Sequence, residues 1–280
     1  MSAGQLKRVA IQGELGSNSH MATLTMLGSD VEVVPCQVSA DVIAAVLQGD
    51  VDGAVLPIEN SLHGSVAEHY DLFLTHPVRP DREISMRIVH NLIAAPGVKL
   101  EDIHTILSHP VALSQCRRFL SEQKQARAAS FYDTAGSVKH VMEQGLLDTA
   151  GIAPALAAQV YDAEILVPGV EDHAENYTRF HLVRRAEDEV LLDGEANKVT
   201  AAFAIEHRPG SLVDALQGLA ATGANLTKIE SRPVPGKPWE YVFYVDFRFD
   251  GADVAEAALA SLREHSAMVK EIGRYRAAES

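Results

Sequence analysis

The stretch that decides the fold is residues 53–58, which read GAVLPI. A nearly unbroken apolar run of this length is typical of a strand that is buried on both faces of a parallel sheet. Similar short runs at 9–11, 105–107 and 149–153 alternate with amphipathic segments. Strands that alternate with helices predict a mostly parallel α/β fold over roughly the first 165 residues.

The pattern changes after residue 183. Residues 184–197 are polar and charged and predict a linker or an exposed hairpin. Beyond them the expected elements are a strand at 199–205, a helix opened by 209–211, a strand at 226–233, a turn at 235–238 that leads into a strand at 239–249, a helix through 254–262 and a strand at 267–275. This βαββαβ order is the ferredoxin-like unit. Because two such units can pair their sheets or helices, we expect a homodimer or a homotetramer.

Charge and composition exclude several classes of protein. The 280 residues include 24 Lys plus Arg and 38 Asp plus Glu, for a formal net charge of −14. This excess of acid argues against binding to nucleic acid or to an anionic membrane, because both require a basic face. With 47% hydrophobic and 22% charged residues, the composition is that of an ordinary globular chain.

The cysteines and histidines provide no framework for a disulfide or a metal site. Cys36 and Cys116 lie far apart, which favours a reducing compartment. The first residues lack the apolar stretch of a signal peptide and no long apolar run follows, so we expect a cytoplasmic protein. His63, His69 and His76 are spaced six and seven apart, which matches no zinc pattern, so no metal is expected.

Four loops rich in hydroxyl and small residues precede expected helices. They span residues 13–20, 59–65, 108–110 and 133–137. Simple helix capping explains any one of them, and Pro110 suits the first position of a helix. Together in one α/β unit they favour an anion site, since helix starts present unpaired N–H groups. The polar segment 171–180 runs directly into an apolar strand and is either a wall of a cleft or a solvated connection.

These residues occur in an order that resembles the prephenate dehydratase family. The resemblance rests on Glu59-Asn60-Ser61, Ser108-His109-Pro110, Cys116, Asp133-Thr134-Ala135, Thr178-Arg179-Phe180 and Glu230-Ser231-Arg232-Pro233, and it covers residues 7–276. It implies a catalytic domain over residues 1–185, built as two lobes of periplasmic-binding-protein type with the site between them. It also implies a regulatory ACT domain over residues 197–280, in agreement with the βαββαβ order.

The resemblance implies a cofactor-free lyase of phenylalanine biosynthesis. Prephenate would lose carbon dioxide and water to give phenylpyruvate, and phenylalanine would inhibit the reaction. Aromatisation drives this chemistry, so it requires no metal, flavin or nicotinamide. Two alternatives stay open, namely an arogenate dehydratase and a non-catalytic sensor of aromatic amino acids with the same two-lobed fold.

Roles for individual residues follow from the same resemblance. Thr178 is expected at the leaving hydroxyl, where it orients or relays a proton. Glu59 is either a proton source or has an N-capping or hinge role. Arg179 either binds a substrate carboxylate or braces its loop, and Phe180 is expected to pack. The remaining candidates for catalysis or substrate binding are Asn60, Ser61, Ser108, His109 and Thr134.

The same family pattern assigns an effector site and also shows where this chain departs from it. Phenylalanine would bind between paired ACT domains near Gly210, Leu212, Asn225, Leu226, Glu230, Ser231, Arg232 and Pro233, unless this domain serves only to dimerise. The first loop reads Gly13-Glu14 where the family has Gly-Pro, Val111 replaces a common Gln and Pro154 replaces a common Ser. Because these positions are expected near the cleft, the preference between prephenate and arogenate stays open.

Overall fold

The computed structural model describes residues 6–191, 194–206, 208–234 and 240–278. Within these residues the chain forms two compact units. One unit combines the segments before residue 65 and from 85 to 180, and the other combines 65–84 with the chain from 181 onward. Strands β5 (Val78–Arg87) and β11 (Tyr177–Arg185) pass from one unit into the other. Residues 65–84 therefore group with the C-terminal domain and not with the N-terminal segments.

The first sheet contains the stretch GAVLPI at its centre. Its strand order is β2 (Glu32–Cys36), β1 (Arg8–Gln12), β3 (Gly53–Asn60), β11 and β5, with the short β4 (Gly64–Ser65) beside β3. Strand β1 is parallel to both β2 and β3. Helices α1 (Asn18–Leu27) and α2 (Ser39–Gln48) connect these strands. Val55, Leu56 and Ile58 are fully buried, as expected for a strand with covered faces.

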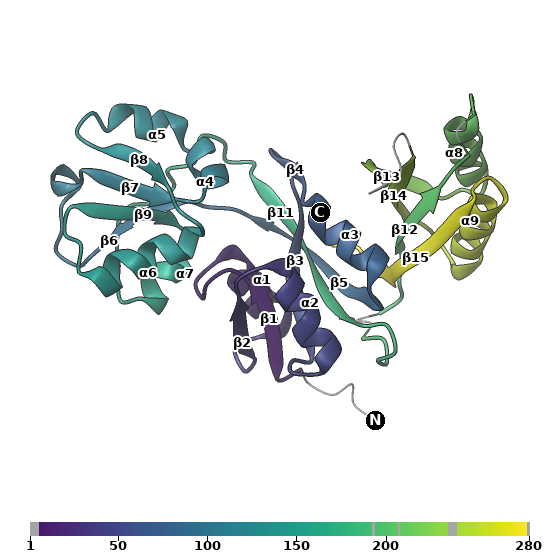
Figure 1. Ribbon diagram of the computed structural model, residues 1–280, viewed down its shortest axis with the longest axis horizontal. Helices are drawn as coiled ribbons and strands as arrows, with labels where there is room; N and C mark the ends of the chain where they lie inside the picture. Colours follow the sequence, from purple (N-terminus) through teal and green to yellow (C-terminus); the bar gives the residue numbers. More distant parts are fainter. Residues whose placement is uncertain (1–5, 192–193, 207, 235–239, 279–280) are drawn as a thin grey trace. The chain divides into compact units, whose positions relative to one another are not determined.

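The second sheet forms the other lobe of the same unit. Its order is β10 (Glu164–Val167), β6 (Asn91–Ala94), β9 (Thr149–Ala153), β7 (Thr105–Ser108) and β8 (Arg127–Ser130). Helices α4 (Pro110–Ser114) and α5 (Arg117–Glu122) cover one face, and α6 (Thr134–Gln144) and α7 (Ala155–Val160) cover the other (Figure 1). A 3-10 turn occupies Leu100–Asp102. Strand β6 is antiparallel to β9, so the sheet is mixed.

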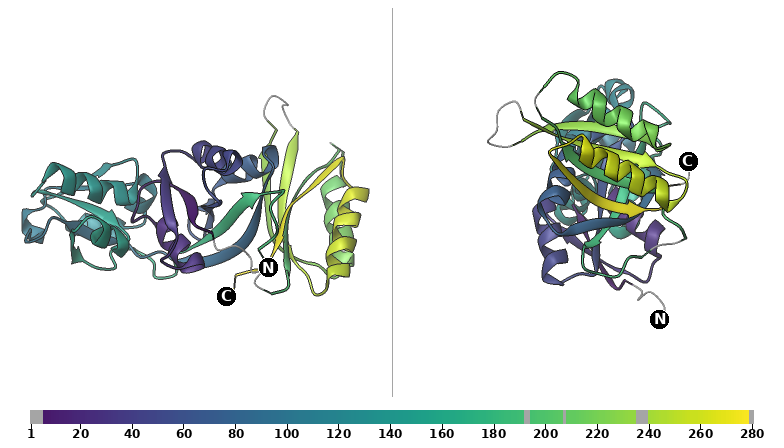
Figure 2. Two further views of the ribbon diagram at one scale, coloured as in Figure 1. Left: turned by 90° about the horizontal axis from the view of Figure 1, so that it is seen from below. Right: turned by 90° about the vertical axis from the view of Figure 1, so that its right-hand side faces the viewer.

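The C-terminal domain has the predicted βαββαβ order. Its elements are β12 (Lys198–Ala204), α8 (Ser211–Ala221), β13 (Asn225–Pro233), β14 (Tyr241–Arg248), α9 (Ala252–Glu264) and β15 (Met268–Tyr275). The strands lie in the order β13-β14-β12-β15. Helices α8 and α9 cover one face of this sheet (Figure 2). Phe203, Leu219 and Leu259 form part of a buried core of this domain. The expected turn at 235–238 and the first residue of the following strand lie outside the described residues.

Helix α3 (Ala67–Thr75) and strand β5 were not predicted from the sequence. Tyr70 and Phe73 of α3 are fully buried, but the polar residues around them weaken the apolar pattern. In β5 the buried positions include Asp81 and Glu83, which is the reverse of the usual apolar signal. Asp81 forms ion pairs with the nearby Arg79 and with Arg184, which lies 103 positions away, so part of the compensation for its burial comes from a partner distant in sequence.

The expected fold class is confirmed, with two α/β lobes followed by a ferredoxin-like domain. Within the described residues, no helix combines the length and the apolar character that crossing a membrane requires. The same residues hold no group of three or more His, Cys, Asp or Glu side chains placed to bind a metal ion.

Candidate active site

Asn60, at the end of β3, is the centre of the candidate site. Its amide nitrogen lies 3.0 Å from the hydroxyl oxygen of Thr178 and 2.7 Å from the side-chain oxygen of Asn176. Its amide oxygen accepts hydrogen bonds of 3.0 Å from the backbone N–H groups of Leu62 and His63. Because β11 pairs with β3, residues 118 apart in sequence meet at this point.

The contact with Asn60 determines what the Thr178 hydroxyl can do. An amide nitrogen can only donate, so the oxygen of Thr178 must accept this bond. Thr178 is 7% exposed. Among the described residues, no acceptor takes its hydroxyl hydrogen. A threonine hydroxyl held in this way has its own hydrogen available for an oxygen atom of a bound molecule.

Gln115 fixes the orientation of Asn60 and was not among the predicted residues. Its amide nitrogen lies 3.4 Å from the side-chain oxygen of Asn60 and 3.0 Å from Nδ1 of His63. Its side-chain oxygen lies 2.7 Å from Nε2 of His90, which is buried. Burial lowers the pKa of His90, so the neutral ring donates through Nε2 to Gln115. The only signal for Gln115 in the sequence was its place directly after the short helix that begins at Ser108-His109-Pro110.

Asn176 is the second missed residue, although the segment that contains it was singled out. It is fully buried immediately before β11, and its side-chain oxygen accepts the bond from Asn60. Its amide nitrogen has no hydrogen-bond partner among the described residues. The polar segment 171–180 therefore supplies both Asn176 and Thr178 to the wall of the site.

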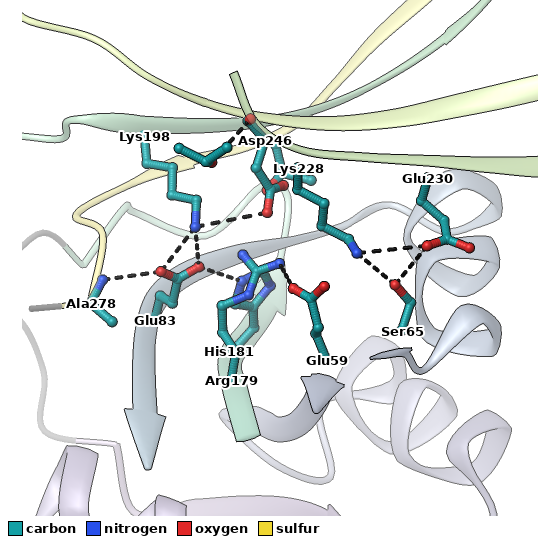
Figure 3. Close-up of polar contacts among 12 residues, drawn as sticks. Glu59, Ser65, Glu83, Arg179, His181, Lys198, Lys228, Glu230, Asp246 and Ala278 are labelled. Carbon is teal, nitrogen blue, oxygen red and sulfur yellow. Dashed lines mark hydrogen bonds and ion pairs between the residues drawn. The ribbon is translucent and has the colours of Figure 1, made fainter. Parts of the chain in front are cut away.

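Arg179 and Glu59 lie on neighbouring strands and form an ion pair. The guanidinium Nη2 lies 3.0 Å from Oε2 of Glu59 (Figure 3). The side chain of Arg179 is 12% exposed and that of Glu59 is 34% exposed. This geometry favours the bracing role for Arg179 over direct binding of a substrate, although the guanidinium keeps further donors. Phe180 is 1% exposed and packs in the interior.

Ser61 and Ser108 use their hydroxyl groups in bonds to the backbone. Ser61 Oγ donates to the carbonyl oxygen of Glu175 at 3.2 Å and accepts from the N–H of Tyr177 at 3.0 Å. Ser108 is fully buried at the end of β7 and donates to the carbonyl oxygen of Ile152 at 2.6 Å. Both serines therefore hold the segments that carry the site, and the hydroxyl hydrogen of each is engaged.

His109 and Asp133 cap two helices of the second lobe. His109 Nδ1 accepts from the N–H of Val111 at 3.3 Å at the start of α4, and Asp133 accepts from the N–H of Gly136 at 2.7 Å at the start of α6. Burial raises the pKa of Asp133, while the Gly136 bond and the nearby His109 oppose this shift. Thr134 follows directly, and its hydroxyl has no hydrogen-bond partner among the described residues.

The loop after β1 contacts the second lobe through several atoms. Glu14 accepts a 2.9 Å bond from the hydroxyl of Tyr132 and forms a 3.0 Å ion pair with Lys139 of α6. A Cβ atom at Gly16, where φ is +84°, would lie 2.7 Å from Cα of Ala157. Glycine is required at this position by both the positive φ and the close approach. Two of the four predicted loops, at 13–20 and 133–137, thus meet in one region of the unit.

The comparison with known families agrees with this geometry. The family model described as prephenate dehydratase matches residues 9–188. The chain belongs to the prephenate dehydratase family.

Known proteins of the prephenate dehydratase family are similar to this chain over nearly its whole length. Arogenate dehydratase/prephenate dehydratase 2 of Arabidopsis thaliana is 38% identical over 98% of this chain and 74% of its own length. The structure of a prephenate dehydratase from Arthrobacter aurescens in complex with L-Phe is 30% identical, covers 96% of this chain and 89% of its own, and has a TM-score of 0.86. The structure titled GqqA, a novel type of quorum quenching acylases, is 32% identical, with coverage of 97% and 98% and a TM-score of 0.87.

The expected effector residues of this dehydratase-family chain lie at the start of α8 and on both faces of β13. Glu230 (Figure 3) and Arg232 of β13 contact the segment formed by residues 65–75. Ser231 and Pro233 are exposed. Leu212 and Leu226 pack against the core under α8 and α9. Gly210, with φ of +89°, precedes α8, and Asn225 begins β13. The Glu-Ser-Arg-Pro tetrad therefore does not form a single contact surface.

Proposed function

We propose that this chain converts prephenate to phenylpyruvate, carbon dioxide and water, and that L-phenylalanine inhibits it through an ACT domain formed by residues 197–280. The reaction releases the ring carboxylate as carbon dioxide, and the electron pair of that bond moves through the ring. The ring aromatises as the bond to the hydroxyl breaks, and one proton converts the departing hydroxide to water. The protein must therefore place a hydrogen-bond donor at the leaving oxygen and exclude bulk water.

The contact between Asn60 and Thr178 is the observation that carries this proposal. Asn60 donates to Thr178, which directs the hydroxyl hydrogen of Thr178 away from Asn60. A positioned donor of this kind stabilises the negative charge that develops on the leaving hydroxyl. Thr178 would act as donor or proton relay, while Glu59 holds Arg179 beside it. The unbonded hydroxyl of Thr134 and the amide of Asn176 supply further donors for the carboxylates of the substrate.

The same contact argues against acyl transfer by Thr178. A threonine nucleophile needs a base within hydrogen-bond reach. Among the described residues, the side-chain partner of the Thr178 hydroxyl is the Asn60 amide, which cannot accept a proton through its nitrogen. The similarity to an acylase in the solved structures nevertheless makes acyl cleavage the activity to measure beside dehydration.

Incubation of the purified chain with prephenate and with arogenate, each with and without L-phenylalanine, tests the proposal. Release of phenylpyruvate and carbon dioxide from prephenate, inhibited by L-phenylalanine, is the expected result. Faster turnover of arogenate would assign the chain to the arogenate dehydratases, whose names occur among its relatives. Binding of an aromatic amino acid without turnover of either substrate would identify a sensor, and acyl release from an N-acylated amine would identify an acylase.

A further inference from the structure

Helix α3 is attached to the C-terminal sheet at its C-terminal end. Lys270 of β15 donates to the carbonyl oxygens of Phe73 and Leu74, at 2.8 Å in both cases. These carbonyls belong to the last turn of α3, which has no intrahelical partners for them and carries partial negative charge. Lys270 therefore caps α3 with a cation from the sheet.

The middle of α3 is attached through Asp71. Arg232 of β13 forms a 2.8 Å ion pair with Asp71, and the hydroxyl of Tyr244 of β14 lies 3.3 Å from the same carboxylate. The hydrogen bond to Asp71 raises the pKa of Arg232. The rings of Tyr70 and Tyr244 lie 5.2 Å apart, which adds apolar contact beside the ion pair.

Ser65, which precedes α3, attaches the start of the 65–75 segment to β13. Its hydroxyl donates to Oε2 of Glu230 at 2.8 Å and lies 2.5 Å from the ammonium group of Lys228 (Figure 3). The side chain of Lys228 is 9% exposed and its ammonium group lies 5.6 Å from the ring centroid of Tyr70. Ser65 is therefore held by two residues of β13 that alternate along one face of the strand.

A register shift in β13 and the alternation of its side chains explain which of its residues face the 65–75 segment. The pairing with β14 shifts between Leu226 and Lys228. Leu226 consequently packs on the helix-covered core, whereas Lys228, Glu230 and Arg232 contact the 65–75 segment. Successive side chains of a strand point to opposite faces, so Ser231 lies on the face away from α3, where it is exposed.

Ser65 lies five residues after Asn60 in one short loop. The first part of this loop is attached to Asn60, whose side chain accepts from the N–H groups of Leu62 and His63. The last part is attached to β13 through Ser65. The loop thus joins the residue that orients Thr178 to the strand that carries the expected effector residues.

We propose that Ser65 and Asp71 are positioning residues, which transmit the state of β13 to Asn60 through the 60–65 loop and α3. In this arrangement Glu230 and Arg232 act on the loop and helix, and Ser231 contacts the effector. An effector that shifts β13 would move Ser65 and thereby displace Asn60 from Thr178. The regulatory part rests on the proposed function, because it requires that L-phenylalanine binds this domain. An effector transmits a signal only if it binds two arrangements of the chain with different affinity.

The test compares Ser65→Ala, Ser65→Thr and Asp71→Asn in the full chain. The matched control is Glu256→Gln, which removes a 2.7 Å ion pair with Arg274 in the same domain but touches neither α3 nor β13. Steady-state rates with prephenate give kcat and KM, and calorimetry gives the dissociation constant for L-phenylalanine. We expect Ser65→Ala and Asp71→Asn to bind L-phenylalanine as the wild type does while its half-inhibitory concentration rises at least about fivefold. We also expect kcat to change more than KM, and Ser65→Thr to restore both properties.

Each of the other outcomes contradicts a stated part of the proposal. Wild-type inhibition and wild-type kcat in both variants would overturn the proposal, as would an equal effect of Glu256→Gln. Loss of L-phenylalanine binding in Asp71→Asn would place Asp71 in the effector site instead. If the wild type neither binds nor responds to L-phenylalanine, the regulatory part of the proposed function fails. The kcat of Ser65→Ala against Ser65→Thr then decides the positioning role alone.

Discussion

The amide of Asn60 donates to the hydroxyl of Thr178 across 3.0 Å, between two strands whose contact residues lie 118 positions apart. This bond fixes the direction of the single hydrogen that Thr178 can donate. In the proposed function the site works by orientation: the amide of Asn60, which does not release a proton under ordinary conditions, positions the hydroxyl that we propose contacts the substrate. The predictions below test this arrangement and its supports.

Thr178→Ala should lower kcat by about 10² to 10⁴, the range for loss of a positioned donor or proton-transfer group. Thr178→Ser keeps the hydroxyl and should retain most of the activity. Steady-state rates with prephenate measure both, and thermal unfolding checks that the alanine variant is folded. An alanine variant with wild-type kcat would remove Thr178 from the mechanism.

Gln115→Leu should lower kcat by up to about 10², because misplacement of a catalytic group by about 1 Å has an effect of this size. Leucine has a similar volume but cannot donate to Asn60 or accept from His90. The matched control is Gln125→Leu, since Gln125 lies in an exposed turn away from the site. Rates and KM for both variants distinguish a positioning effect, which appears in kcat, from a loss of substrate binding.

Much of this site could be predicted from sequence, and the exceptions have physical causes. Asn60 and Thr178 belong to short motifs at the end of β3 and at the start of β11, and the pairing of these two strands brings their side chains together. Gln115 and Asn176 act through side-chain contacts that no periodicity encodes. In the fold, α3 and β5 were missed because a buried Glu83 and Asp81 invert the apolar pattern, and their partners lie about a hundred positions away. The register shift between Leu226 and Lys228, which places these two residues on opposite faces of β13, is not visible in the sequence spacing.

The pH dependence of stability should contain a contribution from His90. Its pKa is lowered in the folded chain by burial, so the unfolded chain binds more protons between the folded pKa and about 6.5. The free energy of unfolding should therefore fall as the pH decreases from about 6.5 through the folded pKa. In His90→Asn this fall should be smaller. Urea unfolding at pH 7.5 and 5.5 measures the fall in the free energy of unfolding, with a variant of the exposed His104, His104→Gln, as control. An equal fall in wild type and His90→Asn would contradict the prediction.

Lys198→Met should lower the free energy of unfolding by about 3–5 kcal/mol, the usual effect of breaking a buried ion pair. Lys198 forms a 2.8 Å ion pair with Glu83, and the two side chains are 8% and 3% exposed. His181 lies 3.2 Å from the same carboxylate. The double variant Lys198→Met, Glu83→Leu also removes the Glu83 carboxylate and should be less destabilised than the single variant, because of the two buried carboxylates beside Lys198 only Asp246, which accepts from Thr200, remains. Urea unfolding of the three proteins measures the difference.

Glu14→Ala should raise KM for prephenate while kcat is largely kept. Glu14 contacts Tyr132 and Lys139 of the second lobe but none of the side chains that hold Thr178. The ion pair with Lys139 is partly exposed, at 33% and 21%, so its own contribution to stability is small. Its effect should instead appear in the population of chains whose lobes are in contact, because the proposed function places the substrate where the loops of both lobes meet.

The matched control for Glu14→Ala is Glu32→Ala, which removes an exposed 3.1 Å ion pair with Arg8 inside the first lobe. Small-angle X-ray scattering with and without substrate should show a larger radius of gyration for Glu14→Ala only when substrate is absent, because we expect substrate bound between the lobes to hold them together in both proteins. High salt should raise the KM of the wild type toward that of the variant, because salt screens partly exposed charges. A KM that changes equally in Glu32→Ala would mean that the effect comes from net charge and not from the contact between the lobes.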